Sequence, residues 1–158
     1  MDMEPNREEI YQVVYTSHTT AKFNEGMLVS LLNHARRTNA NLGLTGALMY
    51  HAGFFAQCLE GPAEVVSALL ERIIRDERHH NFVIVFEQTT TKRAFPKWFM
   101  GGAAILDSNA LRLSTVEWEA LEQTSSALNP ASPGFVLMRS LWEAHSAEAV
   151  SLKTARQP

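Results

Sequence analysis

The order in which two kinds of hydrophobic spacing alternate constrains the fold of this chain more than any other feature. Short runs rich in β-branched, aromatic and other apolar residues predict strands at residues 10–16, 44–50, 54–60, 82–86 and about 98–105. Apolar residues at helical spacing fill the two longer gaps between them. The resulting order, β-α-β-β-α-β-β, predicts an α+β fold of the split-βαβ, ferredoxin-like type. In that fold the first and third strands are neighbours, and both helices cover one face of the sheet.

Both helices of this core have recognisable ends. The first follows Asn24, which can cap a helix, and should end near Arg37, because residues 38–41 and Gly43 continue a helix poorly. The second should begin at Gly61-Pro62, since proline is favoured in the first turn of a helix. The helical spacing is carried by Met27, Leu28, Leu31, Leu32 and Ala35 in the first helix and by Val65, Val66, Leu69, Leu70, Ile73 and Ile74 in the second.

Period-two alternation sorts the side chains of the first and third strands onto opposite faces. On the first strand Tyr11, Val13 and Tyr15 share one face, and Gln12, Val14 and Thr16 share the other. On the third strand the two sets are Phe55, Gln57 and Leu59, and Phe54, Ala56 and Cys58. The fourth run, Phe82 to Phe86, is apolar at every position, which predicts a strand at the centre of the sheet or covered on both faces.

After Asp107 the composition changes and two further helices are expected. Ser114-x-x-Glu117 is a capping box that opens a helix to about Leu128. Residues 129–134 break the chain, and residues 135–147 predict a last helix with Phe135, Met138, Leu141, Trp142 and His145 on one side. The sequence thus divides into a loose leader at residues 1–9, a core domain at 10–106 and a helical extension at 107–158. The extension should pack on the sheet or on another subunit, with Trp142 and Phe135 as apolar candidates for an output surface.

Composition excludes several classes of partner. The 158 residues suit one domain, and the net charge of −3 gives no reason to expect a nucleic acid or an anionic membrane as partner. A single cysteine, Cys58, suits a reducing, cytoplasmic compartment. The chain begins without the pattern of a signal peptide, and no apolar run is long enough to cross a membrane.

Enzyme and metal patterns are also missing from the sequence. There is no glycine-rich phosphate loop, and a hydrolytic triad is not recognisable. His79 and His80 are adjacent, so they point to opposite faces of an extended segment, and no metal site is expected. Cys58 in the middle of a strand is more often a small buried residue than a nucleophile. We therefore expect a protein that is not an enzyme.

Two polar residues, Tyr15 and Gln57, stand out on strands that should be apolar. If the first and third strands pair, these two side chains can lie side by side at the centre of the sheet. Leaving the Gln57 amide unsatisfied there would cost about 1–3 kcal/mol. Two plainer interpretations stay open: Gln57 faces solvent or the C-terminal helices, and Tyr15 is a core tyrosine with its hydroxyl at the rim.

Five short motifs in register resemble one family. Tyr15-x-Ser17, Thr38-Asn39 before Leu44-Thr45-Gly46, and Phe55-x-Gln57-x-Leu59-Glu60-Gly61 occur in this order. Arg72-Ile73-x-x-Asp76-x-Arg78-His79 and Phe95-x-x-Trp98-x-Met100 follow them. From about Ile10 to Ile105 the chain resembles a BLUF domain, a sensor of blue light using flavin adenine dinucleotide (FAD).

The resemblance implies that FAD is held between the two helices, with its ring edge meeting Tyr15 and Gln57. Asn39 would match the pyrimidine edge of the ring, because its amide both donates and accepts. Thr38 stands beside it, where relatives often carry Asn or His. Arg37 and Arg72 are expected at the pyrophosphate, and Asp76 and His79 at the ribose and adenine. A plainer alternative for Arg72 and Asp76 is an i,i+4 ion pair. The apolar slot would come from Leu28, Leu31, Val65, Leu69 and Ile73.

The resemblance also implies a mechanism. Excited flavin takes an electron and then a proton from Tyr15, and their return leaves the bonds among Tyr15, Gln57 and the flavin rearranged, with a small red shift. Trp98 or Met100 would relay the change. Signalling would then pass by contact to a downstream protein, in a chain that forms homo-oligomers.

Two other interpretations keep the same fold. One is a light-insensitive regulatory or association module without a functional flavin. The other is an acylphosphatase-like hydrolase, which would need an arginine cradle where Ser17-His18-Thr19-Thr20 has none.

Overall fold

A computed structural model describes residues 8–96, 101–105 and 129–155 of the chain. The strands are β1 (Ile10–Thr19), β2 (Thr45–His51), β3 (Phe54–Gly61), β4 (His79–Thr90) and β5 (Gly101–Ile105). The helices are α1 (Met27–Leu42), α2 (Ala63–Ile74) and α4 (Pro133–Ala155). The helix expected to open at Ser114 lies outside the described residues.

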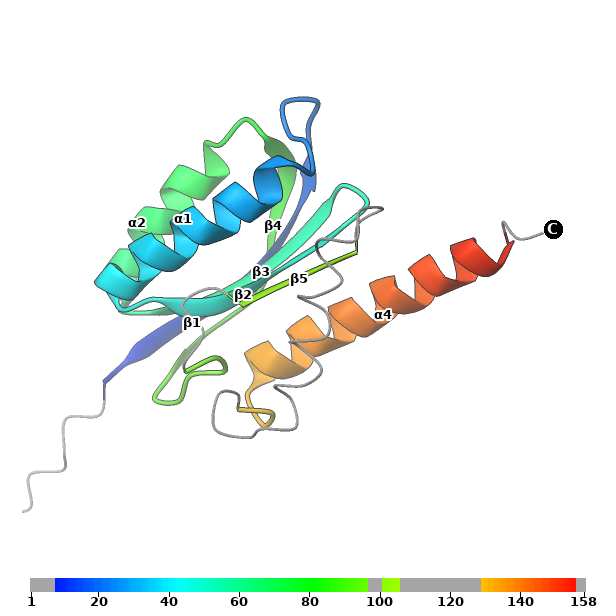
Figure 1. The fold of residues 1–158 in the computed structure, drawn as a ribbon. Helices are drawn as coiled ribbons and strands as arrows, with labels where there is room; N and C mark the ends of the chain where they lie inside the picture. Colours follow the sequence, from blue (N-terminus) through cyan, green and yellow to red (C-terminus); the bar gives the residue numbers. More distant parts are fainter. Residues whose placement is uncertain (1–7, 97–100, 106–128, 156–158) are drawn as a thin grey trace, which may run out of the picture.

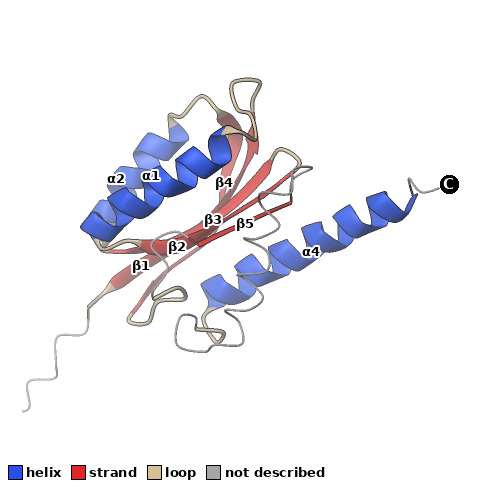
Figure 2. Ribbon diagram, in the orientation of Figure 1, coloured by secondary structure: helices blue, strands red, loops and turns tan. Residues whose placement is uncertain are grey.

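One five-stranded sheet organises the molecule, in the order β4-β1-β3-β2-β5. Neighbouring strands are antiparallel except β2 and β5, which are parallel. Helices α1 and α2 lie on one face of the sheet and α4 lies on the other (Figures 1 and 2). The predicted α+β fold is confirmed, including the pairing of the first and third strands.

The two faces of the sheet carry separate apolar cores, as the alternation along β1 and β3 predicts. The core beneath α1 and α2 includes Val13, Tyr15, Leu28, Leu32, Leu44, Leu48, Tyr50, Phe55, Leu59, Val66 and Leu70. The core beneath α4 includes Val14, Ala47, Met49, Ala56, Cys58, Ala94, Phe95, Phe135, Met138 and Trp142. Phe135 and Trp142 are therefore buried against the sheet, one of the two places where the extension was expected to pack.

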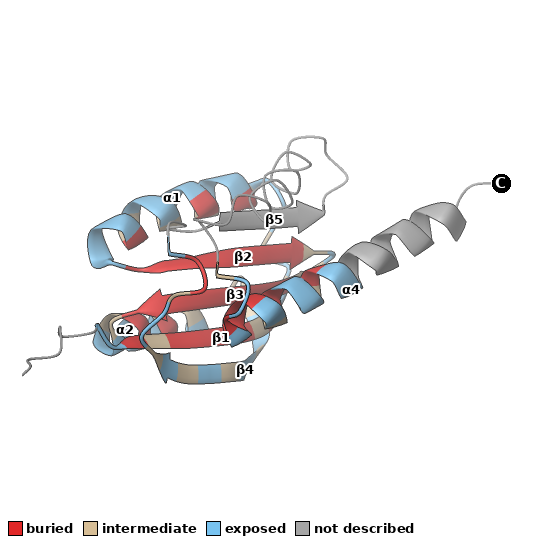
Figure 3. Ribbon diagram, turned by 90° about the horizontal axis from the view of Figure 1, so that it is seen from below, coloured by how far each residue is buried: buried red, intermediate tan, exposed pale blue. Residues whose placement is uncertain are grey.

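The apolar run in β4 does not mark a central strand. Strand β4 lies at the edge of the sheet, with Val83 53% and Ile84 42% exposed (Figure 3). Only the two ends of the run turn inward: Phe82 packs against the core beneath α1 and α2, and Phe86 against the core beneath α4. An irregularity of register between Val14 and Tyr15 on the neighbouring β1 separates these two contacts.

Helix α1 is longer than the sequence predicts. It continues past Arg37 to Leu42 and ends at Gly43, which has the left-handed φ of 70° and donates its backbone N–H to the carbonyl of Asn39. Burial of Asn39 outweighs the weak helical propensity of residues 38–41. At the other end the side chain of Asn24 does not cap the helix; its backbone carbonyl accepts the N–H of Met27 at 3.0 Å instead.

Candidate functional site

A cavity of about 280 Å³ lies among α1, α2 and the sheet. Its volume is near the lower end of the range for small-molecule pockets, roughly 300–1,000 Å³. The sheet, both helices and the loops that follow β1 and α2 all contribute lining residues. They are Tyr15, Phe23, Leu31, His34, Ala35, Thr38, Asn39, Leu48, Phe55, Gln57, Leu69, Arg72, Ile73, Asp76, Arg78 and His79.

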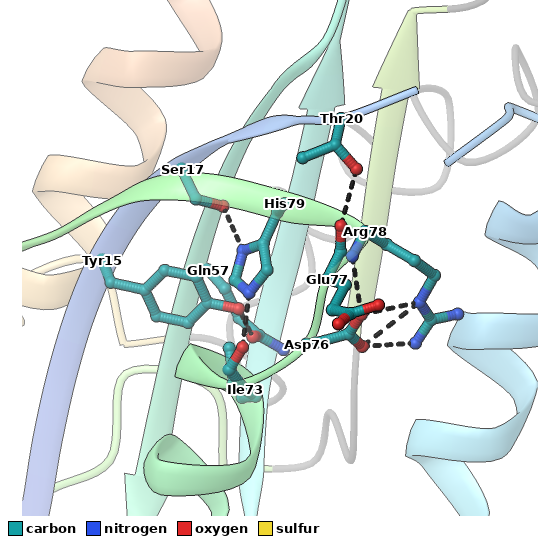
Figure 4. A network of polar contacts seen from close by, with 9 residues as sticks. All are labelled: Tyr15, Ser17, Thr20, Gln57, Ile73, Asp76, Glu77, Arg78 and His79. Carbon is teal, nitrogen blue, oxygen red and sulfur yellow. Dashed lines mark hydrogen bonds and ion pairs between the residues drawn. The ribbon is translucent and has the colours of Figure 1, made fainter. Parts of the chain in front are cut away.

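Tyr15 and Gln57 meet at the floor of this cavity. They are direct partners in the pairing of β1 with β3, and the Tyr15 hydroxyl donates a hydrogen bond to Oε1 of Gln57 (Figure 4). Both side chains are buried, and the Tyr15 ring lies 4.6 Å from that of Phe82. Gln57 thus faces the helix-covered cavity, and the interpretation that it faces solvent or the C-terminal helices is wrong.

Burial fixes the protonation state of this tyrosine. Removal from water raises the pKa of the Tyr15 hydroxyl well above its usual value near 10, and the negative charge of Asp76 raises it further. Tyr15 is therefore a neutral hydrogen-bond donor throughout the physiological pH range.

Raised tyrosine pKa values also predict how the protein absorbs at alkaline pH. The pKa of Tyr11 is raised to about 12 by its hydrogen bond to Glu87 and by burial, and burial raises that of Tyr50. All three tyrosines of the chain thus favour folding below pH 10, and this stability is lost as the pH rises through their folded values. At about pH 10.5 we expect less tyrosinate absorbance in the folded protein than in denaturant. A full tyrosinate band in protein that circular dichroism shows to be folded would contradict this.

Helix α1 presents one regular stripe to the cavity. Leu31, His34, Ala35, Thr38 and Asn39 follow the i, i+3, i+4 spacing of a single helical face. Asn39 is the most buried of them, at 2% exposure. Because α1 stays helical through these positions, Arg37 lies off the stripe and does not line the cavity. His34, which the sequence interpretation missed, does line it.

Helix α2 supplies the opposite wall. Leu69, Arg72 and Ile73 line the cavity, whereas Leu28 and Val65 pack in the core beside it. Of the five residues expected to form an apolar slot, Leu31, Leu69 and Ile73 are in place. Arg72 is exposed and lies next to the cavity with its cationic side chain.

Beyond α2 the chain leaves helical register, and Asp76 pairs with Arg78. Nη2 of Arg78 lies 2.6 Å and Nε 3.0 Å from the carboxylate oxygens of Asp76 (Figure 4). The hydrogen bonds from Arg78 hold the pKa of Asp76 below its usual value. This pair replaces the i,i+4 pairing with Arg72 that the sequence left open. Sequence reasoning did not assign Arg78 to the site, although it belongs to the same motif.

His79 lines the cavity while both of its ring nitrogens are engaged by the protein. Nε2 contacts the carbonyl of Ile73, which can only accept, so this nitrogen carries the proton. Nδ1 lies 2.8 Å from the hydroxyl oxygen of Ser17 and forms the second hydrogen bond of the ring (Figure 4). His79 thus ties the end of α2 to β1, two residues beyond Tyr15.

Other candidates of the sequence stand apart from the cavity. Trp98 and Met100 lie outside the described residues. Cys58 is buried on the opposite face of the sheet, and burial raises the pKa of its thiol, as expected of an unreactive core residue. Among the described residues no three His, Cys, Asp or Glu side chains are grouped to hold a metal ion. In the same residues no helix is long and apolar enough to cross a membrane.

The cavity as a whole suits a flat ligand with a polar edge. Leucine, isoleucine and phenylalanine side chains offer apolar contact, and Tyr15, Asn39 and Gln57 bring hydrogen-bonding groups to its interior. Arg72 and Arg78 add positive charge from α2 and the loop after it.

Named relatives match more than half of this chain. Over 92 residues the chain is 35% identical to the photoactivated adenylate cyclase subunit beta of Euglena longa, a match that covers 58% of this chain and 11% of that protein. It is 31% identical over 85 residues to the blue light- and temperature-regulated antirepressor BluF of Escherichia coli, covering 54% of this chain and 21% of the relative. The chain thus spans about a tenth to a fifth of these relatives.

A solved structure and the family profile agree with these matches. The dark-state structure of BlrB, a BLUF protein, matches 92% of this chain and 98% of its own, with 26% identity and a TM-score of 0.60. The profile of the family described as sensors of blue light using FAD matches residues 10–101. A BLUF domain is a flavin-binding photosensor and not a catalytic domain. The chain belongs to the BLUF family of blue-light sensors.

Proposed function

We propose that the light response of this chain is a rearrangement of the hydrogen bonds between Tyr15, Gln57 and FAD held without a covalent bond in the cavity. The observation that carries the proposal is the buried hydrogen bond from Tyr15 to Gln57 at the cavity floor. The sensor would comprise residues 10–106, and residues 107–158 would form an extension for output or oligomerisation.

The lining residues fit a flavin. The buried amide of Asn39 can pair with the pyrimidine edge of the ring, next to Thr38, while Leu31, Leu69 and Ile73 contact its apolar body. Arg72, together with Arg78 and its partner Asp76, would hold the phosphates and ribose of FAD. His79 would position this wall through Ser17 and Ile73 rather than bond the cofactor with its ring nitrogens. Arg37 has no part in this arrangement, because it lies off the cavity face of α1.

The switch follows from the chemistry of the two side chains. When bound, the flavin supplies the absorption of blue light and a transient acceptor for one electron and one proton, both of which return. Tyr15 holds its proton toward Oε1 of Gln57 in the resting state. A tyrosine oxygen that has lost its proton can only accept, so it favours the Nε2 end of Gln57. Rotating or tautomerising the amide exchanges its donor and acceptor ends without moving the backbone.

The energy available to such a switch is small. Each altered hydrogen bond contributes about 0.5–1.5 kcal/mol, which shifts a balanced equilibrium several-fold. The responding element must therefore be nearly balanced between two positions. We propose that Trp98 or Met100 relays the change and that signalling passes through contact with a partner protein, in a homo-oligomer. Helix α4 packs on the other face of the same strands.

The identity of the cofactor can be tested at Arg72. Arg72→Ala should weaken binding of FAD by roughly 5- to 10-fold, the value of one exposed charge-assisted contact, and leave binding of riboflavin, which has no phosphate, unchanged. Arg75→Ala is the matched control, because Arg75 is exposed at the end of α2 and does not line the cavity. Titration of the flavin-free protein with each flavin gives both constants. Equal losses for FAD and riboflavin would contradict phosphate recognition at this position.

A further inference from the structure

A second polar cluster lies on the opposite face of the sheet, where α4 begins. We call Gln12, Thr45, Glu60, Arg93 and Ser132 the Glu60 cluster. Strand pairing sets Gln12 beside Glu60, and Glu60 beside Thr45, in one row across β1, β3 and β2. Gln12 and Glu60 are both fully buried. Neither residue faces the flavin cavity, so the proposed photochemistry leaves this cluster unexplained.

All the acceptor positions of the Glu60 carboxylate are used. One oxygen accepts the Thr45 hydroxyl at 3.0 Å and the N–H of Phe95 at 2.6 Å. The other accepts Nε2 of Gln12 and the N–H of Ala94, both at 2.8 Å. Four donors around two oxygens is the arrangement of an ionised carboxylate, which only accepts. Nη1 of Arg93 donates to the Thr45 hydroxyl oxygen at 2.9 Å. Because that hydroxyl donates to Glu60, a single side chain separates the positive guanidinium from the carboxylate.

Gln12 connects this carboxylate to the start of α4. Its Nε2 donates to Glu60 and also to the hydroxyl of Ser132, at 3.3 Å, while its Oε1 accepts from Gln88 at 2.8 Å. Ser132 precedes the first residue of α4, and its carbonyl accepts the N–H of Val136 at 3.0 Å. A Cβ at Gly134, in the first turn, would lie 2.5 Å from Oε1 of Gln12. The helix therefore approaches the amide as closely as glycine allows.

The same carboxylate also holds the segment that α4 packs on. Ala94 and Phe95 donate their N–H groups to Glu60, and the carbonyl of Ala94 accepts the N–H of Asn129 at 2.9 Å. The Phe95 ring lies 5.8 Å from that of Phe135 in α4. Apolar packing between these elements is strong but non-directional, whereas the hydrogen bonds of Glu60 fix one position for each.

We propose that Glu60 and Gln12 are positioning residues that dock α4 on the sheet. The Glu60 carboxylate orients the Gln12 amide, and Gln12 in turn holds Ser132 at the start of the helix. Removing the charge should release the first turns of α4 while leaving the cavity on the opposite face intact. This proposal concerns the far face alone and stands whether or not the protein responds to light.

The single cysteine of the chain provides a native probe of docking. Cys58 lies in the core beneath α4 and is fully buried. Burial also raises the pKa of its thiol, so labelling requires α4 to lift from the sheet. In Glu60→Gln the new amide N–H group points toward the donors of Ala94 or Gln12, so it cannot accept their hydrogen bonds. We therefore expect N-ethylmaleimide to label Cys58 of this variant at least about 10-fold faster than Cys58 of the wild-type protein, both in the dark. Glu64→Gln, exposed in the first turn of α2, should label at the wild-type rate.

A double variant that exchanges the residues at positions 12 and 60, called the swapped pair, distinguishes loss of α4 docking from a general loss of stability. Combining Glu60→Gln with Gln12→Glu moves the carboxylate to β1, where it can still accept from Ser132, Gln88 and the amide at position 60. The amide at position 60 still opposes the Ala94 N–H, so we expect partial rescue, with labelling several-fold slower than in Glu60→Gln alone. A second buried substitution in a merely weakened sheet would instead accelerate labelling further. If Glu60→Gln fails to fold, Ser132→Ala removes only the contact with α4 and should accelerate labelling several-fold. Wild-type labelling in a folded Glu60→Gln or Ser132→Ala protein, or no rescue in the swapped pair, would overturn the proposal.

Discussion

Tyr15→Phe is expected to leave the flavin bound and to abolish the light-induced red shift. The substitution removes one hydroxyl and keeps the ring that packs 4.6 Å from Phe82. Loss of the buried hydrogen bond to Gln57 should cost about 1–3 kcal/mol, less than the roughly 5–15 kcal/mol that stabilises a typical folded domain. The proton that the proposed switch moves is nevertheless gone, so the effect on the light response should be complete.

Tyr11→Phe is the matched control for this experiment. Tyr11 lies on the same strand and the same face, but its hydroxyl donates to Glu87 at 2.5 Å, away from the cavity. Light-minus-dark difference spectra of the two variants at equal flavin content give the comparison. Tyr11→Phe should keep the red shift at full amplitude. A normal photocycle in Tyr15→Phe would contradict the assignment of the hydrogen-bond switch to Tyr15.

Asn39→Ala is expected to weaken flavin binding by about 10-fold or more. Its side chain is buried against the cavity, and a ligand edge that loses a buried amide partner loses roughly 1–3 kcal/mol. The helix itself should not suffer, because alanine has the higher helical propensity and the backbone carbonyl that Gly43 and Leu44 contact is unchanged. Weaker binding would therefore report the lost contact.

Asn41→Ala supplies the comparison for Asn39. Asn41 is the last residue but one of α1 and is exposed, so its loss should leave the affinity for flavin unchanged. The measurement is the flavin-to-protein ratio after gel filtration, together with Kd from titration of the flavin-free protein. Unchanged retention and an unchanged spectrum in Asn39→Ala would mean that this amide does not meet the ring.

Strand alternation predicted the centre of the molecule well. The period of two is a local property, so within each strand it could separate Tyr15 from Val14 and Gln57 from Cys58 before any pairing was known. The α+β order then required β1 and β3 to be neighbours, which brings Tyr15 and Gln57 together. Locally encoded geometry and one topological rule thus made this part of the site possible to anticipate, while the strand register that makes the two residues direct partners comes from the structure.

Features that depend on tertiary context were not predictable in this way. The end of α1 is set by burial of Asn39 and by the conformation of Gly43, and the local propensity of residues 38–41 predicted the opposite. The resemblance placed Arg37 at the pyrophosphate, but α1 continues past this residue and leaves it off the cavity face. The apolar run of β4 was interpreted as central because hydrophobicity reports burial on average and carries no information on strand order.

The Glu60 cluster was missed for a related reason. Glu60 entered the sequence interpretation only as part of a motif, and its partner Gln12 is 48 residues away in the chain. Ser132, the other partner of the Gln12 amide, lies 120 residues from Gln12. Once Tyr15 is paired with Gln57, however, the antiparallel register also pairs Gln12 with Glu60. A buried amide facing a buried carboxylate could have been recognised from that register alone.

The most direct test of the central claim is the absorption spectrum of the purified protein in darkness, after blue light and again in darkness. The switch at Tyr15 and Gln57 predicts a flavin spectrum that shifts slightly to the red on illumination and returns in the dark. A bound flavin without a reversible shift would contradict the switch. Protein that takes up no flavin, even when FAD is added, would contradict the binding site itself and leave an association module of the same fold.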